Sequence, residues 1–321
     1  MSNFPYTPTS LFHINSTGNT FVVDETPLLK KLSPAEVSFW KEEEKIQQAC
    51  HKHKVDGLAI LFANNKHHLQ WQFFNADGKP ANMCGNLARG LIYYLSKKFP
   101  HEKTAFSLLG PNNTVQTGCI KNSLPFLSMP QGKKLPSSNE PYLQELYSTT
   151  FLKSLSEAYS AVTYIDLGVP HALLPIYPDQ LSLPVEFIRF FNAGADLKQH
   201  SLHLMQYKIQ QLNTDLQKII QTIRCQNDKG FNVTLFNPNT LHAISFERGV
   251  ENFTLSCGTG ASALAYYLKT FVPLYKSATE VSISMPGGSL LINVEKKEYL
   301  LGGKCQILSV NSIEKCFEHK K

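Results

Sequence analysis

The stretch Leu255–Leu268 reads Leu-Ser-Cys-Gly-Thr-Gly-Ala-Ser-Ala-Leu-Ala-Tyr-Tyr-Leu, and the fold can be worked out from it. A cysteine stands directly before a glycine-rich turn, and a segment of helical character follows the turn. Cys257 therefore lies where a helix is predicted to begin. The first amides of a helix have no intrahelical partner, and the helix dipole is positive there. Both features favour the thiolate of Cys257, which can act as a base or a nucleophile.

The chain contains this stretch twice. Residues 84–95 read Cys-Gly-Asn-Leu-Ala-Arg-Gly-Leu-Ile-Tyr-Tyr-Leu, and residues 257–268 read Cys-Gly-Thr-Gly-Ala-Ser-Ala-Leu-Ala-Tyr-Tyr-Leu. Cys, Gly, Ala, Leu, Tyr, Tyr and Leu coincide without a gap. The repeat unit is about half of the chain, far longer than the repeat of a solenoid. The sequence therefore predicts two similar halves, each of which presents one cysteine at a helix start.

Composition and charge are those of an ordinary globular protein. The 321 residues are 42% hydrophobic and 17% charged, with a formal net charge of +6. No apolar run approaches the length of a membrane span, and the first residues lack the features of a signal peptide. The lysines are dispersed, which argues against nucleic acid as a partner. We expect a cytoplasmic protein that binds neither membranes nor nucleic acid.

The cysteine pattern favours neither a disulfide framework nor a zinc site. The chain has seven cysteines, an odd number, with irregular spacing and no Cys-x-x-Cys. We therefore expect no metal.

Short strands and few helices are predicted along the chain. Strands are expected at 11–14, 21–23, 58–63 and 68–74, with three more within 104–130. In the second half they are expected at 160–166, 171–176, 231–236, 241–247 and within 280–309. The run Ser33-Pro34-Ala35-Glu36 has the pattern of a helix start and predicts a helix to about residue 52. Further helices are expected near 142–158 and within 197–224. This pattern indicates an α+β protein with two similar domains, 1–135 and 136–321, with the last strand packing back on the first domain.

Two cysteines at helix starts fit the inversion of a carbon acid beside a carboxylate. Inversion removes a proton from one face of the carbon and delivers one to the other, and one base cannot easily do both. Two thiols can, one as thiolate and the other as acid, with exchanged roles for the reverse direction. The amides at the helix starts would hold the substrate carboxylate. A single Cys-Gly before a helix is more often a buried cysteine with a turn, so the repetition carries this interpretation.

Several motifs together resemble the diaminopimelate epimerase family. Asn75-Ala76-Asp77-Gly78 leads to Cys84-Gly85-Asn86, and Glu247-Arg248-Gly249-Val250-Glu251 leads to Cys257-Gly258-Thr259-Gly260. Gly18–Asp24 and Gly168–Ala172 resemble two further motifs of the family. The resemblance implies two pseudo-symmetric domains, each a curved antiparallel-rich sheet or barrel around a central helix. It also implies amino-acid epimerisation without a cofactor, and it leaves a homodimer open.

The resemblance also implies roles for individual residues. Cys84 and Cys257 would be the paired base and acid, and His171 and Glu247 would assist those thiols and hold the substrate amine. Without the resemblance, His171 would more often be a core histidine and Glu247 a surface carboxylate. The residues expected to contact substrate are Asn19, Asn75, Gly85, Asn86, Asn232, Arg248, Gly258 and Thr259.

One departure from the family pattern bears on the substrate. Val169 occupies the place of a usual asparagine that contacts the far end of the substrate, and valine cannot form that hydrogen bond. The first expectation is conversion of LL- to meso-diaminopimelate for lysine and cell-wall synthesis. A related two-cysteine racemase for another amino acid, such as histidine, is the alternative within enzymes. A non-catalytic module that binds a carboxylate at the two helix starts is the alternative outside them.

Overall fold

The computed structural model describes the chain in stretches separated by gaps. They are residues 10–35, 37, 42–63, 68–81, 83–99, 105–110, 113–135, 162–178, 183, 185–192, 214–225, 230–295 and 298–309. The helix predicted near 142–158 lies outside them, as does most of the region 197–224.

The chain divides into two compact units. Unit 1 comprises Met1–Ser128 and Gly302–Lys321, and unit 2 comprises Met129–Leu301. The chain leaves unit 1 within strand β7 (Leu124–Met129) and returns to it within strand β16 (Tyr299–Gly303). The boundary predicted after residue 135 falls inside unit 2.

Unit 1 is built on a mixed, mainly antiparallel sheet in the order β7-β6-β5-β4-β3-β2-β1-β17. The pairs β2 with β3 and β4 with β5 are parallel. The last described strand, β17, pairs with the first strand, β1. The strands predicted in the first half are confirmed, and the bounds of the unit's remaining strands are β1 Leu11–Ser16, β2 Asn19–Asp24, β3 Gly57–Ala63, β4 His68–Asn75, β5 Ala105–Leu109, β6 Val115–Lys121 and β17 Cys305–Ser309.

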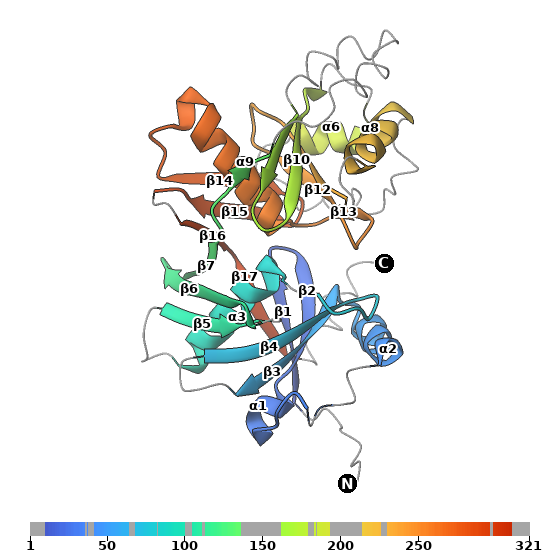
Figure 1. Cartoon of the computed structure of the whole chain (residues 1–321), viewed down its shortest axis with the longest axis vertical. Coiled ribbons are helices and arrows are strands. Elements are labelled where there is room, and N and C mark those ends of the chain that lie inside the picture. Colours follow the sequence, from blue (N-terminus) through green and yellow to red (C-terminus); the bar gives the residue numbers. More distant parts are fainter. Residues whose placement is uncertain are drawn as a thin grey trace. The chain divides into compact units, whose positions relative to one another are not determined.

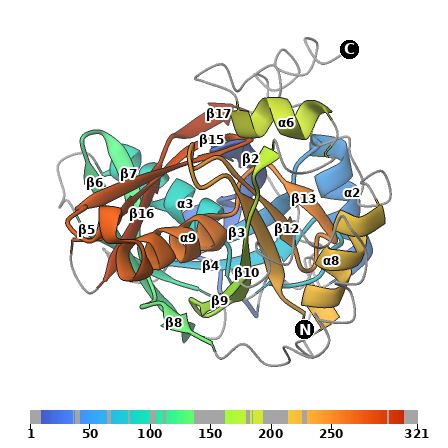
Figure 2. The ribbon, with the colours of Figure 1, turned by 90° about the horizontal axis from the view of Figure 1, so that it is seen from above.

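Helix α3 (Gly85–Lys98) packs inside the curve of this sheet. It contacts β1 and β17 as well as β5 and β6, which are separated by three strands in the sheet order (Figures 1 and 2). Strands so far apart can touch one helix only if the sheet curves around it. Leu87, Leu91 and Ile92 are fully buried on the helix, and each contributes roughly 1.5–3 kcal/mol through burial.

The helix predicted from Ser33 is wrong in its start. Pro34 and Ala35 form a turn, and helix α2 runs over Glu43–His53. Its buried residues, Ile46 and Cys50, are four apart and form the apolar stripe that packs on the core of unit 1. That stripe, rather than the capping pattern, sets where the helix forms. A short helix that was not predicted, α1, spans Thr26–Lys30.

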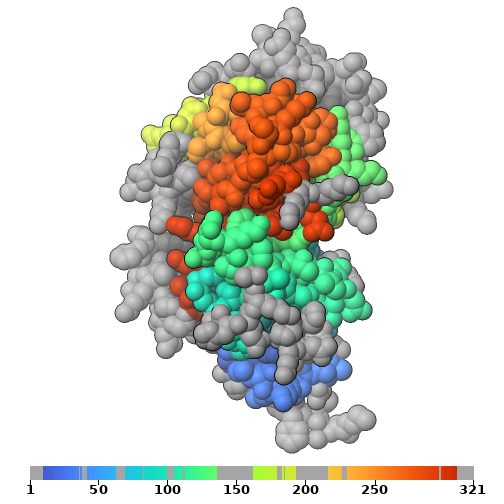
Figure 3. Space-filling view, turned by 90° about the vertical axis from the view of Figure 1, so that its left-hand side faces the viewer, coloured from blue at the N-terminus to red at the C-terminus, as the bar shows by residue number. Residues whose placement is uncertain are grey.

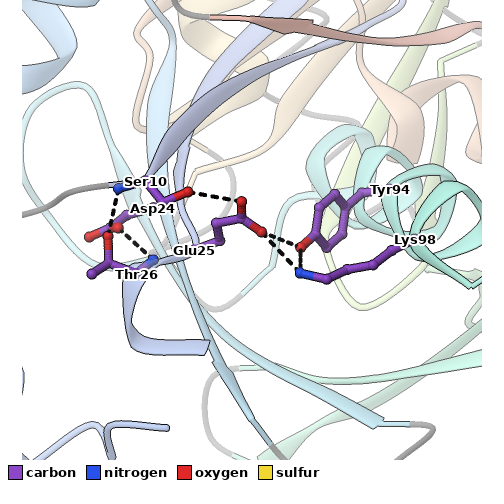
Figure 4. Close-up of polar contacts among 6 residues, drawn as sticks. All are labelled: Ser10, Asp24, Glu25, Thr26, Tyr94 and Lys98. Carbon is purple, nitrogen blue, oxygen red and sulfur yellow. Dashed lines mark hydrogen bonds and ion pairs between the residues drawn. The ribbon is translucent and has the colours of Figure 1, made fainter. Parts of the chain in front are cut away.

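A polar cluster joins the end of α3 to the start of α1 (Figure 4). Tyr94 donates a hydrogen bond of 2.6 Å to Glu25, and Lys98 lies 3.1 Å from the same carboxylate oxygen. Ser10 donates to the other oxygen at 2.9 Å. These three donors together lower the pKa of Glu25. The carboxylate therefore fixes three segments of unit 1 to one another.

Unit 2 contains two groups of strands. One sheet has the order β13-β12-β11-β10-β9-β8, in which only β10 and β11 are parallel. The second group has the order β14-β15-β16. The bounds of these strands are β8 Lys133–Lys134, β9 Thr163–Asp166, β10 Pro170–Pro175, β11 Asn232–Phe236, β12 Ala243–Glu247, β13 Asn252–Thr254, β14 Glu280–Met285 and β15 Gly288–Asn293.

Helix α9 (Gly258–Phe271) is the counterpart of α3 in unit 2. It contacts β9, β10 and β11 of the larger sheet and also β14 and β15 (Figure 1). Helices α6 (Val185–Asn192) and α8 (Thr214–Cys225) contribute to the apolar core beside β10 to β13. Helix α9 is followed by the short helix η5 (Pro273–Tyr275), where Leu274 is 80% exposed. Figure 3 shows the orange part of the chain, to which these residues belong by number, at the surface.

The fold is therefore α+β, with a curved, antiparallel-rich set of strands around a central helix in each unit. Both central helices have 14 residues, and both begin directly after a cysteine of the repeat. In the described parts of the chain, no helix is long and apolar enough to cross a membrane.

Candidate active site

Cys84 is the residue immediately before α3, as predicted. Its backbone is extended (φ −140°, ψ 107°), and its side chain is half-buried. The first hydrogen bond within the helix runs from the Ala88 amide to the Cys84 carbonyl at 2.9 Å. The amides of Gly85 and Asn86 precede that bond, so they lie at the positive end of the helix dipole.

A buried arginine links this helix start to the β1–β2 turn. Arg89 is 0% exposed and donates to Asn86 Oδ1 at 3.2 Å and to Thr17 Oγ1 at 2.8 Å. It also donates to the Gly302 carbonyl at 3.0 Å. Burial lowers the pKa of Arg89, while the thiols of Cys305 and Cys84 act in the opposite direction. The guanidinium charge is therefore held at the start of α3 through its hydrogen bond to Asn86.

Asn19 and Asn75 lie at the same end of β2 and β4, the two strands on either side of β3 in unit 1. Asn19 begins β2 and Asn75 ends β4. Gly57 starts β3 between them, where it pairs with Asn75 and with Phe21, two residues after Asn19. The Asn19 Oδ1 atom is buried and has no hydrogen-bond partner among the described residues. Because β2 runs parallel to β3 and β4 antiparallel to it, both predicted asparagines lie at the same end of these strands.

Cys257 has the same place before α9 that Cys84 has before α3. Its backbone is extended (φ −118°, ψ 103°), and its side chain is only 2% exposed. The Gly260 amide donates to its sulfur at 3.3 Å, and Thr259 Oγ1 lies 3.5 Å from the sulfur. The predicted helix start is therefore confirmed, and Gly258 opens the helix.

His171 lies beside this helix start, fully buried on β10. Its Nε2 atom is 2.8 Å from Thr259 Oγ1, and its Nδ1 atom is 3.4 Å from Thr234 Oγ1. Burial, together with the charge of Arg248, lowers the pKa of His171 to about 3. The imidazole is therefore neutral at physiological pH and acts through hydrogen bonds.

The remaining residues predicted for the second half gather around the same histidine. Asn232 is the partner of His171 in the β10–β11 register, and its Oδ1 accepts from the Arg248 amide at 2.7 Å. Glu247 ends β12, and Thr254 on β13 donates to its carboxylate. Unit 2 thus brings together Cys257, Gly258, Thr259, His171, Asn232, Glu247 and Arg248.

The expectation that the helix start favours the thiolate is wrong for Cys257. Burial raises its pKa well above the ordinary value, and the nearby Glu247 carboxylate raises it further. Hydrogen bonds from Thr259 and the Gly260 amide act in the opposite direction but are outweighed. Desolvation therefore outweighs the effect of the helix start and favours the protonated thiol of Cys257.

The sequence analysis missed three polar residues of these clusters. Arg89 looked like an ordinary charge in a helix, although it is fully buried. Thr234 and Ser245, both 0% exposed, are a cross-strand pair on β11 and β12 with 2.9 Å between their hydroxyl oxygens. In the sequence each is an ordinary strand residue. The register shows that they pair, and both hydroxyls lie close to Gly260 at the start of α9. Within the described stretches, no three His, Cys, Asp or Glu side chains gather as a metal site.

Comparison with curated proteins identifies relatives along most of the chain. A diaminopimelate epimerase of Helicobacter pylori (strain P12) is 24% identical over 316 residues, which cover 96% of this chain and 98% of the relative. A diaminopimelate epimerase of Aquifex aeolicus is 27% identical over 271 residues, 81% of each chain. No protein-family model matches the chain.

Comparison with solved structures finds the same fold. The structure of a predicted epimerase from Pseudomonas aeruginosa aligns with a TM-score of 0.61 and 12% sequence identity. The alignment covers 93% of this chain and 96% of that one. Relatives in sequence therefore support the resemblance seen in the cysteine motifs, and the neighbour in structure supports the fold.

Proposed function

Because this chain is an isomerase related to the diaminopimelate epimerases, we propose that it interconverts LL- and meso-diaminopimelate by proton transfer between Cys84 and Cys257. The observation that carries the proposal is the pair of cysteines, each the last residue before a 14-residue helix at the centre of its unit. The reaction would serve lysine and cell-wall synthesis in the cytoplasm and would need no cofactor.

The unlike surroundings of the two thiols support different resting roles. Cys257 is held as a thiol by burial and by Glu247, so it is suited to deliver a proton. Cys84 is half-buried with the Arg89 charge nearby, and a cation favours a thiolate, so Cys84 is suited to remove a proton. In the reverse direction the two thiols exchange roles, since each step leaves one protonated and the other not.

The helix starts would stabilise the charge that develops during the reaction. The amides of Gly85 and Asn86 and those of Gly258 and Thr259 precede the first bond within each helix. Such amides bind a carboxylate and stabilise the negative charge that spreads onto it as the carbanion forms. Glu247 and the neutral His171 would hold the substrate amine, and Arg248, Asn232, Asn19 and Asn75 would contact the ends of the substrate.

A two-cysteine racemase for another amino acid is the second candidate, and Val169 favours it. This half-buried residue lies in the turn before β10, next to the strand that carries His171. Its apolar side chain cannot hydrogen-bond the second amino-acid group of diaminopimelate. Exchange of the α-proton in deuterated water, measured over a panel of amino acids, separates the candidates. Exchange with another amino acid but none with diaminopimelate would replace the first candidate with the second.

Substitution of each cysteine tests the two-base mechanism. Cys84→Ser and Cys257→Ser should each reduce epimerisation at least about 100-fold, because proton transfer by a positioned group contributes about 10²–10⁴-fold and serine is a far weaker acid. The measurement is turnover by circular dichroism of the purified variants. Cys225→Ser, at an exposed position on α8, is the control and should keep full activity.

The same variants separate an enzyme from a binding module. A module that only binds a carboxylate would show no turnover and would keep its ligand affinity after either substitution. Normal turnover by Cys84→Ser or by Cys257→Ser would contradict the proposed mechanism.

A further inference from the structure

A series of hydrogen-bonded side chains, all buried except the half-buried Thr259, extends from Cys257 into the sheet of unit 2. The Cys257 sulfur is 3.5 Å from Thr259 Oγ1, which is 2.8 Å from His171 Nε2. On the other side of the ring, Nδ1 is 3.4 Å from Thr234 Oγ1, which is 2.9 Å from Ser245 Oγ. The last two residues have no part in the proposed reaction, yet they are connected to its thiol.

The far end of this series is closely packed beneath the start of α9. Thr234 and Ser245 are both fully buried. A Cβ atom at Gly260 would lie 2.7 Å from the Ser245 hydroxyl and 2.8 Å from the Thr234 hydroxyl. The helix backbone therefore approaches the two hydroxyls closely. They hydrogen-bond to each other, and Thr234 also contacts His171.

The direction of the hydrogen bonds follows from counting donors. Among the residues that the structure describes, Thr234 is the only side-chain partner of the Ser245 hydroxyl. If Ser245 donates to Thr234, then Thr234 donates to His171 Nδ1, and the ring proton lies on Nε2. Nε2–H then donates to Thr259, whose own hydroxyl proton is directed to the Cys257 sulfur. In this direction the hydroxyls of Ser245, Thr234 and Thr259 each donate to an acceptor.

One contact opposes this direction. The Arg248 amide donates to Asn232 Oδ1, so the Asn232 amide nitrogen faces His171 Nε2, at 3.5 Å. That contact would favour an unprotonated Nε2, but its length is at the limit of a hydrogen bond. The reverse direction would leave the buried Ser245 hydroxyl without an acceptor, which costs more than the loss of so long a contact.

We propose that Thr234 and Ser245 are positioning residues that hold His171 as its Nε2–H tautomer, so that the Thr259 hydroxyl donates to the Cys257 sulfur. The role rests on the proposed function, in which Cys257 must become a thiolate in one direction of the reaction. A hydroxyl donated to the sulfur stabilises that thiolate against the opposing Glu247 carboxylate. Arg248, which also faces His171, helps to keep the ring neutral and able to accept from Thr234.

The tautomer can be observed directly in the unmodified protein. Nitrogen NMR of protein labelled with ¹⁵N-histidine distinguishes the two ring nitrogens, and His171→Gln identifies the signals of His171. We expect a protonated Nε2 and an Nδ1 that accepts a hydrogen bond. A proton on Nδ1 would overturn the proposal, and this measurement needs neither substrate nor a variant of Thr234.

Removal of the Thr234 hydroxyl should lower the reactivity of the Cys257 sulfur. In a Cys84→Ser background, Thr234→Val should slow iodoacetamide alkylation of Cys257 at fixed pH by up to about tenfold, the factor for one pKa unit. The expected cause is the loss of the donor to Nδ1, after which Thr259 can turn toward Nε2. Thr234→Ser keeps a hydroxyl and should restore the rate. An unchanged or faster rate in Thr234→Val would overturn the proposal.

The two proposals fail in different ways. The His171 tautomer and the Cys257 alkylation rate are measured without substrate. If the proposed function is wrong, diaminopimelate shows no proton exchange while both measurements give the expected results. Loss of the present inference would show as an Nδ1–H ring or an unaffected Cys257 in a protein that still epimerises its substrate.

Discussion

At the scale of single residues, Arg89 shows how a buried charge can be held without a carboxylate. Its guanidinium donates to a carbonyl, a hydroxyl and an amide oxygen, from Gly302, Thr17 and Asn86. These oxygens come from three separate parts of unit 1. The planar fork of arginine can reach all three at once, and lysine cannot.

Replacement of Arg89 should destabilise unit 1. Arg89→Met removes three hydrogen bonds from a charged donor to buried oxygens, and each such bond contributes about 1.5–3 kcal/mol. We expect a lower urea midpoint of unfolding, followed by circular dichroism. Arg89→Lys should recover only part of the loss. Lys97→Met, at an exposed site on the same helix, should change stability by no more than about 0.5 kcal/mol, and an equally small effect of Arg89→Met would refute the assignment.

At the scale of elements, each cysteine is positioned by the close approach of a helix start to a sheet. In α9 that approach requires glycine at position 260, where a side chain would meet the hydroxyls of Thr234 and Ser245. Gly260→Ala should therefore reduce the free energy of unfolding by roughly 1–3 kcal/mol through overpacking. It should also reduce turnover of the fraction that remains folded, because the thiol is displaced. Thermal unfolding and activity measure the two effects.

A matched substitution on the same helix controls for helix propensity. Thr270→Ala lies at an exposed position near the end of α9 and should leave both properties nearly unchanged. If Gly260→Ala behaved like Thr270→Ala, the close packing at the helix start would have no functional importance.

Elements were predictable where local sequence decides them. The two cysteine helices were found because the repeat places Cys-Gly before an apolar, helix-forming segment in both halves. The capping pattern at Ser33 misled because a cap satisfies amides but does not supply an apolar face, and the helix formed where Ile46 and Cys50 supply one. The Thr234–Ser245 pair was not predictable, since it depends on the register of two strands.

At the scale of the whole molecule, buried neutral histidines make the chain sensitive to acid. Burial lowers the pKa of His13 to about 4, with His53 nearby adding to the effect. Both ring nitrogens of His13 are buried without a hydrogen-bond partner among the described residues. Burial also lowers the pKa of His53, His171 and His242. Such histidines are found in both units.

Stability should therefore fall as the pH falls from about 6.5 toward 4. In that window His13 binds a proton in the unfolded chain but not in the folded one, so protonation favours unfolding. Below the pKa of folded His13 both states are protonated, and stability falls no further through this residue. His13→Leu should reduce the decrease in unfolding free energy between about pH 7 and pH 4.5 by on the order of 2 kcal/mol. Urea unfolding at both pH values measures it, with the exposed His51→Leu as control. An unchanged pH dependence in His13→Leu would contradict this account.

The path of the chain through unit 1 has a consequence for its synthesis on the ribosome. Unit 1 begins with Met1–Ser128 but is completed only by Gly302–Lys321. Until those residues emerge, β1 lacks its neighbour β17 and Arg89 lacks the Gly302 carbonyl. Unit 2 is continuous and can fold while it is being made, whereas unit 1 must wait with an open strand edge, which is a site for aggregation. Nascent chains that stop short of residue 302 should therefore need protection by chaperones, although they contain both cysteines.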